Sequence, residues 1–184
     1  VQPNNLEFRL RYGELLLQRA RDLETYSLEL DTIGATKEAQ SAYSRVRPLY
    51  EQGLKMHYQL LSSLRGHSLE PNVYLGIART EASLGRKAKA LDTVEKIIPR
   101  SGLSTEIKRQ MWLLKADLSF DLSRASMALE AYKKADSFSN EASLEKSYVA
   151  YKMSWCYFNL KEPNLALQTL KTIVDSSSNR LDLK

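Results

Sequence analysis

An alanine followed by a leucine occurs three times at intervals of 38 residues, and this spacing restricts the possible folds more than any other feature of the sequence. The alanines are Ala90, Ala128 and Ala166. Four further sets keep the same interval: Leu84, Leu122 and Leu160; Ala78, Ala116 and Ser154; Val94, Tyr132 and Leu170; Ile97, Ala135 and Ile173. A fixed period of this length indicates stacked copies of one supersecondary unit, in which each copy buries its apolar face against its neighbours.

The composition indicates that the repeated unit is helical. Hydrophobic residues make up 43% of the 184 residues and charged residues 27%, with only 7 glycines and 5 prolines. This balance is typical of an ordered helical protein, so we expect almost no strand. Breaks at residues 101–102 and 137–140 precede long first helices, which we expect over 103–122 and 140–160.

Each copy resembles the tetratricopeptide repeat (TPR), a pair of helices with small, aromatic and leucine residues at set positions. The aromatic start of the first helix matches Tyr74 and Trp112, whereas the third copy has Ala150 beside Tyr151. The small residue of the first helix and the alanine of the second are present in all copies. The other positions depart from the pattern: the turn glycine is Gly85, Ser123 and Lys161; the late tyrosine is Glu81, Ser119 and Tyr157; and Lys115 replaces a leucine.

The resemblance implies an all-α fold, a right-handed α-solenoid of antiparallel helix hairpins with about eight helices. Residues 72–176 hold the three repeats, at about 72–100, 104–138 and 141–176, within a domain over 71–179 that is followed by a tail at 180–184. An ordinary TPR has 34 residues. The four additional residues add roughly one helical turn, so each copy is an extended repeat.

Small side chains recur at the point where the two helices of each copy cross. Antiparallel helices joined by a turn approach closely only if small residues stand at the crossing. The pairs expected there are Ala78 with Ala90, Ala116 with Ala128, and Ser154 with Ala166. Larger residues would force each hairpin apart.

Residues 1–70 lack the full repeat signature, and we expect a long helical hairpin over 6–33 and 37–65. Gly34 breaks the pattern, Thr36 is a candidate cap, and Pro48 is expected to kink the second helix. One apolar stripe contains Tyr12, Leu16, Leu23, Tyr26, Leu30 and Ile33; the other contains Ala39, Tyr43, Val46, Tyr50, Gly53, His57, Leu60 and Leu64. Because Gly53 lies 37 residues ahead of Ala90, the hairpin is either a cap or a divergent repeat.

The resemblance also places a partner-binding groove on the first helices. The residues that it assigns to the groove are Leu75, Arg79, Leu113, Asp117, Phe120, Tyr148, Tyr151, Trp155 and Phe158, with Ala82, Asp121 and Asn159 beside them. Tyr151, Trp155 and Phe158 share one helical stripe, apart from a core stripe of Met153, Tyr157 and Leu160. The aromatic residues either face the groove or fill space between repeats.

Residues that carry chemistry are few. Cys156 is the only cysteine, and its predicted helical position favours a buried, unreactive thiol. His57 lies on an apolar stripe and is read as a core histidine, and His67 stands beside Gly66 in a predicted loop. Since no metal-ligand spacing, nucleotide-binding loop or hydrolase motif is present, we expect no enzyme, no metal and no cofactor.

The leading hypothesis is a non-enzymatic scaffold that binds a protein or peptide in its groove. The formal net charge is +5, and the excess lies after residue 70, since acidic and basic side chains balance before it. One alternative is a helical-repeat nucleic-acid binder, but acidic residues lie beside the aromatic stripe, so no nucleic acid is expected. Another is a structural oligomerisation module, with self-association through the carboxyl-terminal face.

No transmembrane segment is expected. The resemblance extends to bacterial cell-envelope scaffolds, and this favours a location in the periplasm or envelope over the cytoplasm.

Overall fold

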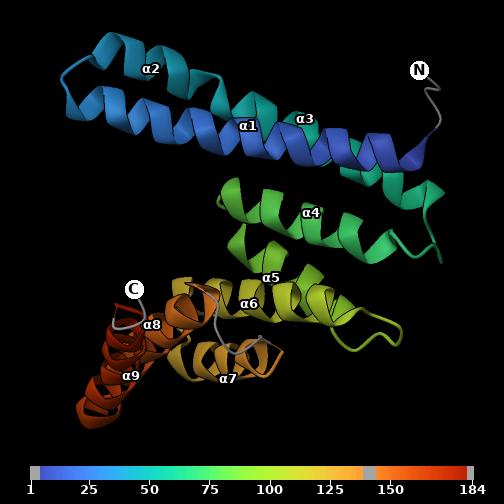
Figure 1. Cartoon of the computed structure of the whole chain (residues 1–184). Coiled ribbons are helices and arrows are strands. Elements are labelled where there is room, and N and C mark those ends of the chain that lie inside the picture. Colours follow the sequence, from blue (N-terminus) through green and yellow to red (C-terminus); the bar gives the residue numbers. More distant parts are fainter. Residues whose placement is uncertain (1–4, 139–143, 182–184) are drawn as a thin grey trace. The chain divides into compact units, whose positions relative to one another are not determined.

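The computed structural model describes residues 5–138 and 144–181, with side chains described up to residue 175 except at 144 and 145. In these residues the secondary structure consists of nine α-helices without any strand (Figure 1). The helices are α1 (Leu6–Thr32), α2 (Thr36–Ser44), α3 (Val46–Ser63), α4 (Glu70–Ser83), α5 (Lys87–Ile97), α6 (Thr105–Asp121), α7 (Ala125–Asp136), α8 (Leu144–Asn159) and α9 (Pro163–Leu181). The all-α prediction is therefore confirmed.

One expected long helix is divided into α2 and α3 at Arg45. Pro48 lies in the first turn of α3, where its missing N–H would have no partner within the helix, so it begins a helix instead of kinking one. The prediction of a cap at Thr36 is wrong. Ala35 precedes α2, and its side chain makes no capping hydrogen bond.

The chain forms two compact units, Val1–Thr93 and Val94–Lys184, with the boundary inside α5. In the first unit α1 packs on α2 and α3, and α3 packs on α4. In the second unit α6 packs on α7, α7 on α8, and α8 on α9. The predicted boundary near residue 70 stays a prediction.

Three turns within the repeats share one backbone geometry. Gly85, Ser123 and Lys161 have φ values of 79°, 59° and 63°. The N–H of the next residue donates to the carbonyl five positions back in each case: Arg86 to Glu81, Arg124 to Ser119, and Glu162 to Tyr157. This pattern ends a helix in the left-handed region and satisfies its last carbonyls, even where glycine is replaced.

A fourth turn of the same kind joins α1 to α2. Gly34 has φ 81°, and the Ala35 N–H donates to the Leu30 carbonyl. Counting from this turn, Ser27 and Ala39 take the positions of the small crossing residues, and they are 4% and 6% exposed. In this alignment Ala39 is the counterpart of Ala90, whereas the sequence spacing had suggested Gly53 for that position.

The predicted crossing residues are all buried. Ala78, Ala90, Ala116 and Ala128 are 0% exposed, Ser154 is 4% and Ala166 is 6%. In the second unit, Ala116 and Ala128 belong to one apolar cluster with Tyr132, Val149 and Cys156. The small side chains thus allow close approach, as the spacing predicted.

Replacing Ala128 by leucine is expected to lower the free energy of unfolding by about 2 kcal/mol, because three additional carbon atoms would be forced into a fully packed crossing. Urea denaturation measures the change. Met127→Leu is the matched control, since Met127 is exposed and its size hardly changes. If the free energy of unfolding of Ala128→Leu equals that of the wild type, Ala128 does not lie at the helix crossing with Ala116.

One predicted apolar stripe is wrong in part. Leu16 is buried and Leu23 packs against an apolar cluster, but Tyr12 and Tyr26 on α1 and Ile33 at its end are 47%, 52% and 77% exposed. The buried residues of α1 are Leu10, Gly13, Leu16, Leu17, Ala20 and Ser27, several of which are small. The second stripe is buried except at Tyr43, which is 61% exposed.

Small residues on α1 and α4 make room for a histidine of α3. His57 is fully buried, and its Nδ1 lies 2.8 Å from the Gly53 carbonyl oxygen. A Cβ atom at Gly13 would lie 3.0 Å from the ring, and one at Gly76 would lie 2.4 Å from Nε2. The prediction of a core histidine is confirmed, and its neighbours explain two of the helical glycines.

Candidate functional site

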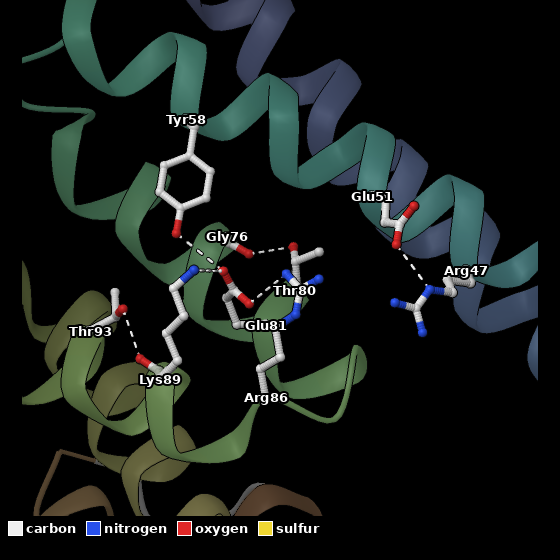
Figure 2. Close-up of polar contacts among 9 residues, drawn as sticks. All are labelled: Arg47, Glu51, Tyr58, Gly76, Thr80, Glu81, Arg86, Lys89 and Thr93. Carbon is white, nitrogen blue, oxygen red and sulfur yellow. Dashed lines mark hydrogen bonds and ion pairs between the residues drawn. The ribbon is translucent and has the colours of Figure 1, made fainter.

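A buried carboxylate lies where the TPR pattern would place a tyrosine late in the first helix. Glu81 on α4 is 0% exposed and accepts three hydrogen bonds (Figure 2). Its donors are the Tyr58 hydroxyl at 3.1 Å, Lys89 Nζ at 2.6 Å and Arg86 Nη1 at 3.1 Å. The acid thereby links α4 to α3 and to the start of α5.

The charges around Glu81 keep it ionised. Burial alone would raise its pKa, but the hydrogen bonds from Lys89 and Arg86 outweigh burial, so the pKa lies below its usual value. Lys89 also lies over the Tyr58 ring, 5.5 Å from its centroid. Since both cations are partly exposed while the acid is buried and holds three donors, this cluster fixes the structure and presents no exposed carboxylate oxygen.

A second carboxylate joins three helices of the second unit. Asp117 on α6 accepts two hydrogen bonds at the same oxygen, Oδ1. Tyr132 on α7 donates at 2.5 Å and Tyr148 on α8 at 3.0 Å. Lys152 reaches over the Phe120 ring from α8, with Nζ 5.1 Å from the centroid. Asp117 thus holds the first helices of two successive repeats together.

Burial perturbs the ionisation of this group. It raises the pKa of Asp117, although the hydrogen bonds from Tyr132 and Tyr148 act in the opposite direction. Burial and the Asp117 charge raise the pKa of both tyrosines, so each hydroxyl keeps its proton and remains a donor. The arrangement fixes the orientation of the two tyrosine side chains.

The predicted aromatic stripe forms an exposed ladder on α8. The side chains of Tyr151, Trp155 and Phe158 are 47%, 44% and 61% exposed. Tyr151 meets Trp155 edge to face with centroids 6.3 Å apart, and Trp155 meets Phe158 in the same way at 6.0 Å. We call these three residues the aromatic ladder. Mutual packing limits their rotamers while their outer faces stay in contact with water.

The remaining predicted groove residues differ in accessibility. Tyr148 is 40% exposed, while Leu113 and Phe120 are half-buried against the apolar cluster of the second unit. In the first unit Arg79 is exposed, but Leu75 is only 4% exposed and offers little surface to a partner. The structure therefore places Asp117 and Phe120 of α6 next to Tyr148 and Lys152 of α8, the helix that also carries the ladder.

Sequence reasoning missed the polar contacts among these residues. Asp117 and Tyr148 are 31 residues apart. This interval is about two helical turns short of one repeat, so the repeat register alone would not have paired these residues on adjacent first helices. Lys115, which replaces a leucine, pairs with Glu95 at 2.8 Å and lies 5.5 Å from the Trp112 ring centroid.

The cysteine of the chain, Cys156, is buried on α8. Burial raises the pKa of the Cys156 thiol to about 11, which keeps it protonated at neutral pH. Within the residues described, no three potential ligands gather to hold a metal ion. A search of those same residues finds no helix with the length and apolar character needed to cross a membrane.

Comparisons with known proteins identify the fold. No protein-family model and no curated protein sequence matches the chain. A crystal structure of MamA superimposes with a TM-score of 0.59 at 11% identity, covering 94% of this chain and 89% of MamA. A second MamA structure gives 0.53 at 13% identity, covering 90% and 95%. This chain therefore has a TPR-like fold of stacked helix hairpins.

Proposed function

We propose that this chain is a scaffold that binds a partner protein or peptide on the face carrying the aromatic ladder. The observation that carries the proposal is the exposure of Tyr151, Trp155 and Phe158 in one prearranged row. Tryptophan and tyrosine are common anchors of protein interfaces, and side chains already held in place lose little entropy on binding.

The residues beside the ladder give the surface a polar border. Asp117 orients Tyr148, and Lys152 contributes a cation over Phe120. Such a border selects the register of a bound segment, while the aromatic side chains supply most of the affinity. We leave Leu75 out of this surface because it is buried.

We further propose that the repeats are 38-residue extended TPR units, and that the α1–α2 hairpin is a divergent repeat at the start of the array. The recurring turn at Gly34, Gly85, Ser123 and Lys161 supports both statements. The cell-envelope location implied by the resemblance stays a prediction.

Neither catalysis nor nucleic-acid binding is part of the proposal. Cys156 is buried and protonated, and Asp117 and Glu81 are engaged by hydrogen bonds. Asp117 and exposed Asp121 place acidic side chains near the ladder, and negative charge there opposes binding of phosphates. Binding of RNA or DNA that weakens steeply with salt would favour the alternative.

Peptides selected from a random library on the purified chain provide the test. Trp155→Ala is expected to raise the dissociation constant of a selected peptide at least tenfold, which corresponds to about 1.4 kcal/mol. Fluorescence polarisation of the labelled peptide gives the constant. Tyr43→Ala is the control, because Tyr43 is similarly exposed but lies in the other unit. Equal affinity of the wild type and Trp155→Ala would refute the proposed surface.

A further inference from the structure

A hollow opens between the two helices of the second repeat. Its volume is about 440 Å³, and both α6 and α7 line it. Trp112 of α6 and Met127 and Ala131 of α7 give it apolar walls. Trp112 is half-buried and Met127 is 38% exposed, so a ligand in the hollow would touch both side chains. None of the three residues of the aromatic ladder lines the hollow, so it is a separate surface.

Three lysines border the hollow. Lys115 comes from α6, and Lys133 and Lys134 come from α7. Lys133 and Lys134 are exposed, and Lys133 Nζ lies 5.6 Å from the centroid of the Tyr157 ring. Among the described residues the Lys134 ammonium has no ion pair, although Glu130 stands one helical turn before it in the same lining. The edge of the hollow is therefore positively charged.

Lys115 occupies a position that is apolar in the other two copies. Its counterparts at the 38-residue interval are Ile77, which is 2% exposed, and Met153, which packs against the apolar cluster of the second unit. The Lys115 ammonium instead reaches Glu95 at 2.8 Å and lies 5.5 Å from the centroid of the Trp112 ring. Core packing gives no reason for a lysine here, whereas a lysine places its stem along an apolar wall and its charge at the edge.

We propose that the hollow receives a large apolar side chain from an acidic segment of a partner protein. The apolar side chain is buried against Trp112, Met127 and Ala131, and carboxylates on either side of it meet Lys133 and Lys134. An apolar interior with a cationic edge is complementary to this pattern of residues. The proposal goes beyond partner binding at the aromatic ladder, and neither site requires the other.

A nucleic acid fits this surface less well. Its affinity depends on neutralising several successive phosphates, and here Glu95 and Glu130 lie beside the lysines. Bases bind by stacking on exposed aromatic faces, whereas Trp112 is half-buried and the other walls are aliphatic. A peptide carries separate carboxylates together with the apolar side chain that the hollow accommodates, so an acidic peptide is the favoured occupant.

The two tryptophans of the chain, Trp112 and Trp155, stand one at each proposed site. Their indole N–H signals in proton–nitrogen NMR spectra therefore report on the two sites separately, and Trp155→Ala assigns them by removing one. The probes are three pools of synthetic octapeptides. In the first pool, two central residues drawn from Leu, Met and Phe are flanked on each side by three acidic residues. The second pool has serines in the centre, and the third has lysines on the flanks.

The first pool is expected to shift the Trp112 signal, and the shift is expected to shrink at high salt because the lysines are exposed. The other two pools are expected to leave the signal in place. No shift with the first pool would overturn the proposal, and so would an equal shift with either of the others. A thymine oligonucleotide that shifts the Trp112 signal when the first pool does not would identify a nucleic acid as the occupant instead.

Lys134→Glu reverses one charge at an exposed position and is expected to raise the dissociation constant of the first pool about tenfold. Lys171→Glu is the matched control, since Lys171 is exposed on α9 and stands 38 residues after Lys133. It is expected to bind like the wild type, and circular dichroism shows whether each variant keeps its helices. Equal affinity of Lys134→Glu and the wild type would refute the site. Trp155→Ala is expected to bind the first pool normally, so this proposal and the aromatic-ladder proposal fail separately.

Discussion

Replacing Gly76 by alanine is expected to lower the free energy of unfolding by about 3 kcal/mol. In an ordinary helix the same substitution stabilises the protein by roughly 0.5–1 kcal/mol. Here the new Cβ would lie 2.4 Å from Nε2 and 2.6 Å from Cδ2 of His57. The ring has no room to withdraw, because it is fully buried, contacts Gly13 and bonds to the Gly53 carbonyl.

Urea denaturation of the purified variants measures the loss. Gly13→Ala is the matched control, because its Cβ would lie at 3.0 Å from the same ring and a smaller loss is expected. The double variant Gly76→Ala with His57→Ala should lose less than the sum of the single variants, since the clash is removed. Full additivity would show that the ring does not cause the loss.

The second expected result is a loss of stability as the pH falls below about 6.5. Burial lowers the pKa of His57, while the hydrogen bond to Gly53 and the charge of Glu14 act the other way. Nε2 is buried without a hydrogen-bond partner. The unfolded chain therefore takes up a proton at a higher pH than the folded chain, and the free energy of unfolding falls by up to about 1.4 kcal/mol per pH unit.

Urea titrations between pH 8 and pH 5 measure this dependence. Near pH 8 His57 is almost entirely neutral in both states and contributes almost no slope. His57→Gln is the comparison, because the difference between the two curves removes the contributions of Glu81, Asp117 and the other acids. Parallel curves from pH 7 to pH 5 would show that His57 does not titrate differently on unfolding.

The sequence was a good guide where the structure depends on residue size. Ala116 and Ala128 were predicted at a helix crossing and are fully buried there. The same approach failed on α1, because it gave weight to large apolar residues such as Tyr12 and Tyr26. The buried face uses Gly13 and other small residues, since the approach of α3 leaves no space for an aromatic ring.

The candidate site was only partly predictable. The row formed by Tyr151, Trp155 and Phe158 follows from helical periodicity, and the structure shows it exposed. The shared hydrogen bonds of Asp117 could not be predicted in the same way. They depend on where α7 and α8 bring Tyr132 and Tyr148 in three dimensions, which no local pattern records.

The shared oxygen of Asp117 also bears on how the second unit comes apart. Arrays of repeats usually lose their terminal hairpins first, because each repeat is supported only by its neighbours. Here Tyr148 ties the start of α8 to α6, and Tyr132 ties α7 to the same atom. Fraying of the last hairpin must therefore break the Tyr148 bond at the same carboxylate oxygen that holds Tyr132 of the hairpin before it. The aromatic ladder is carried by a helix whose amide protons should exchange together with those of α6.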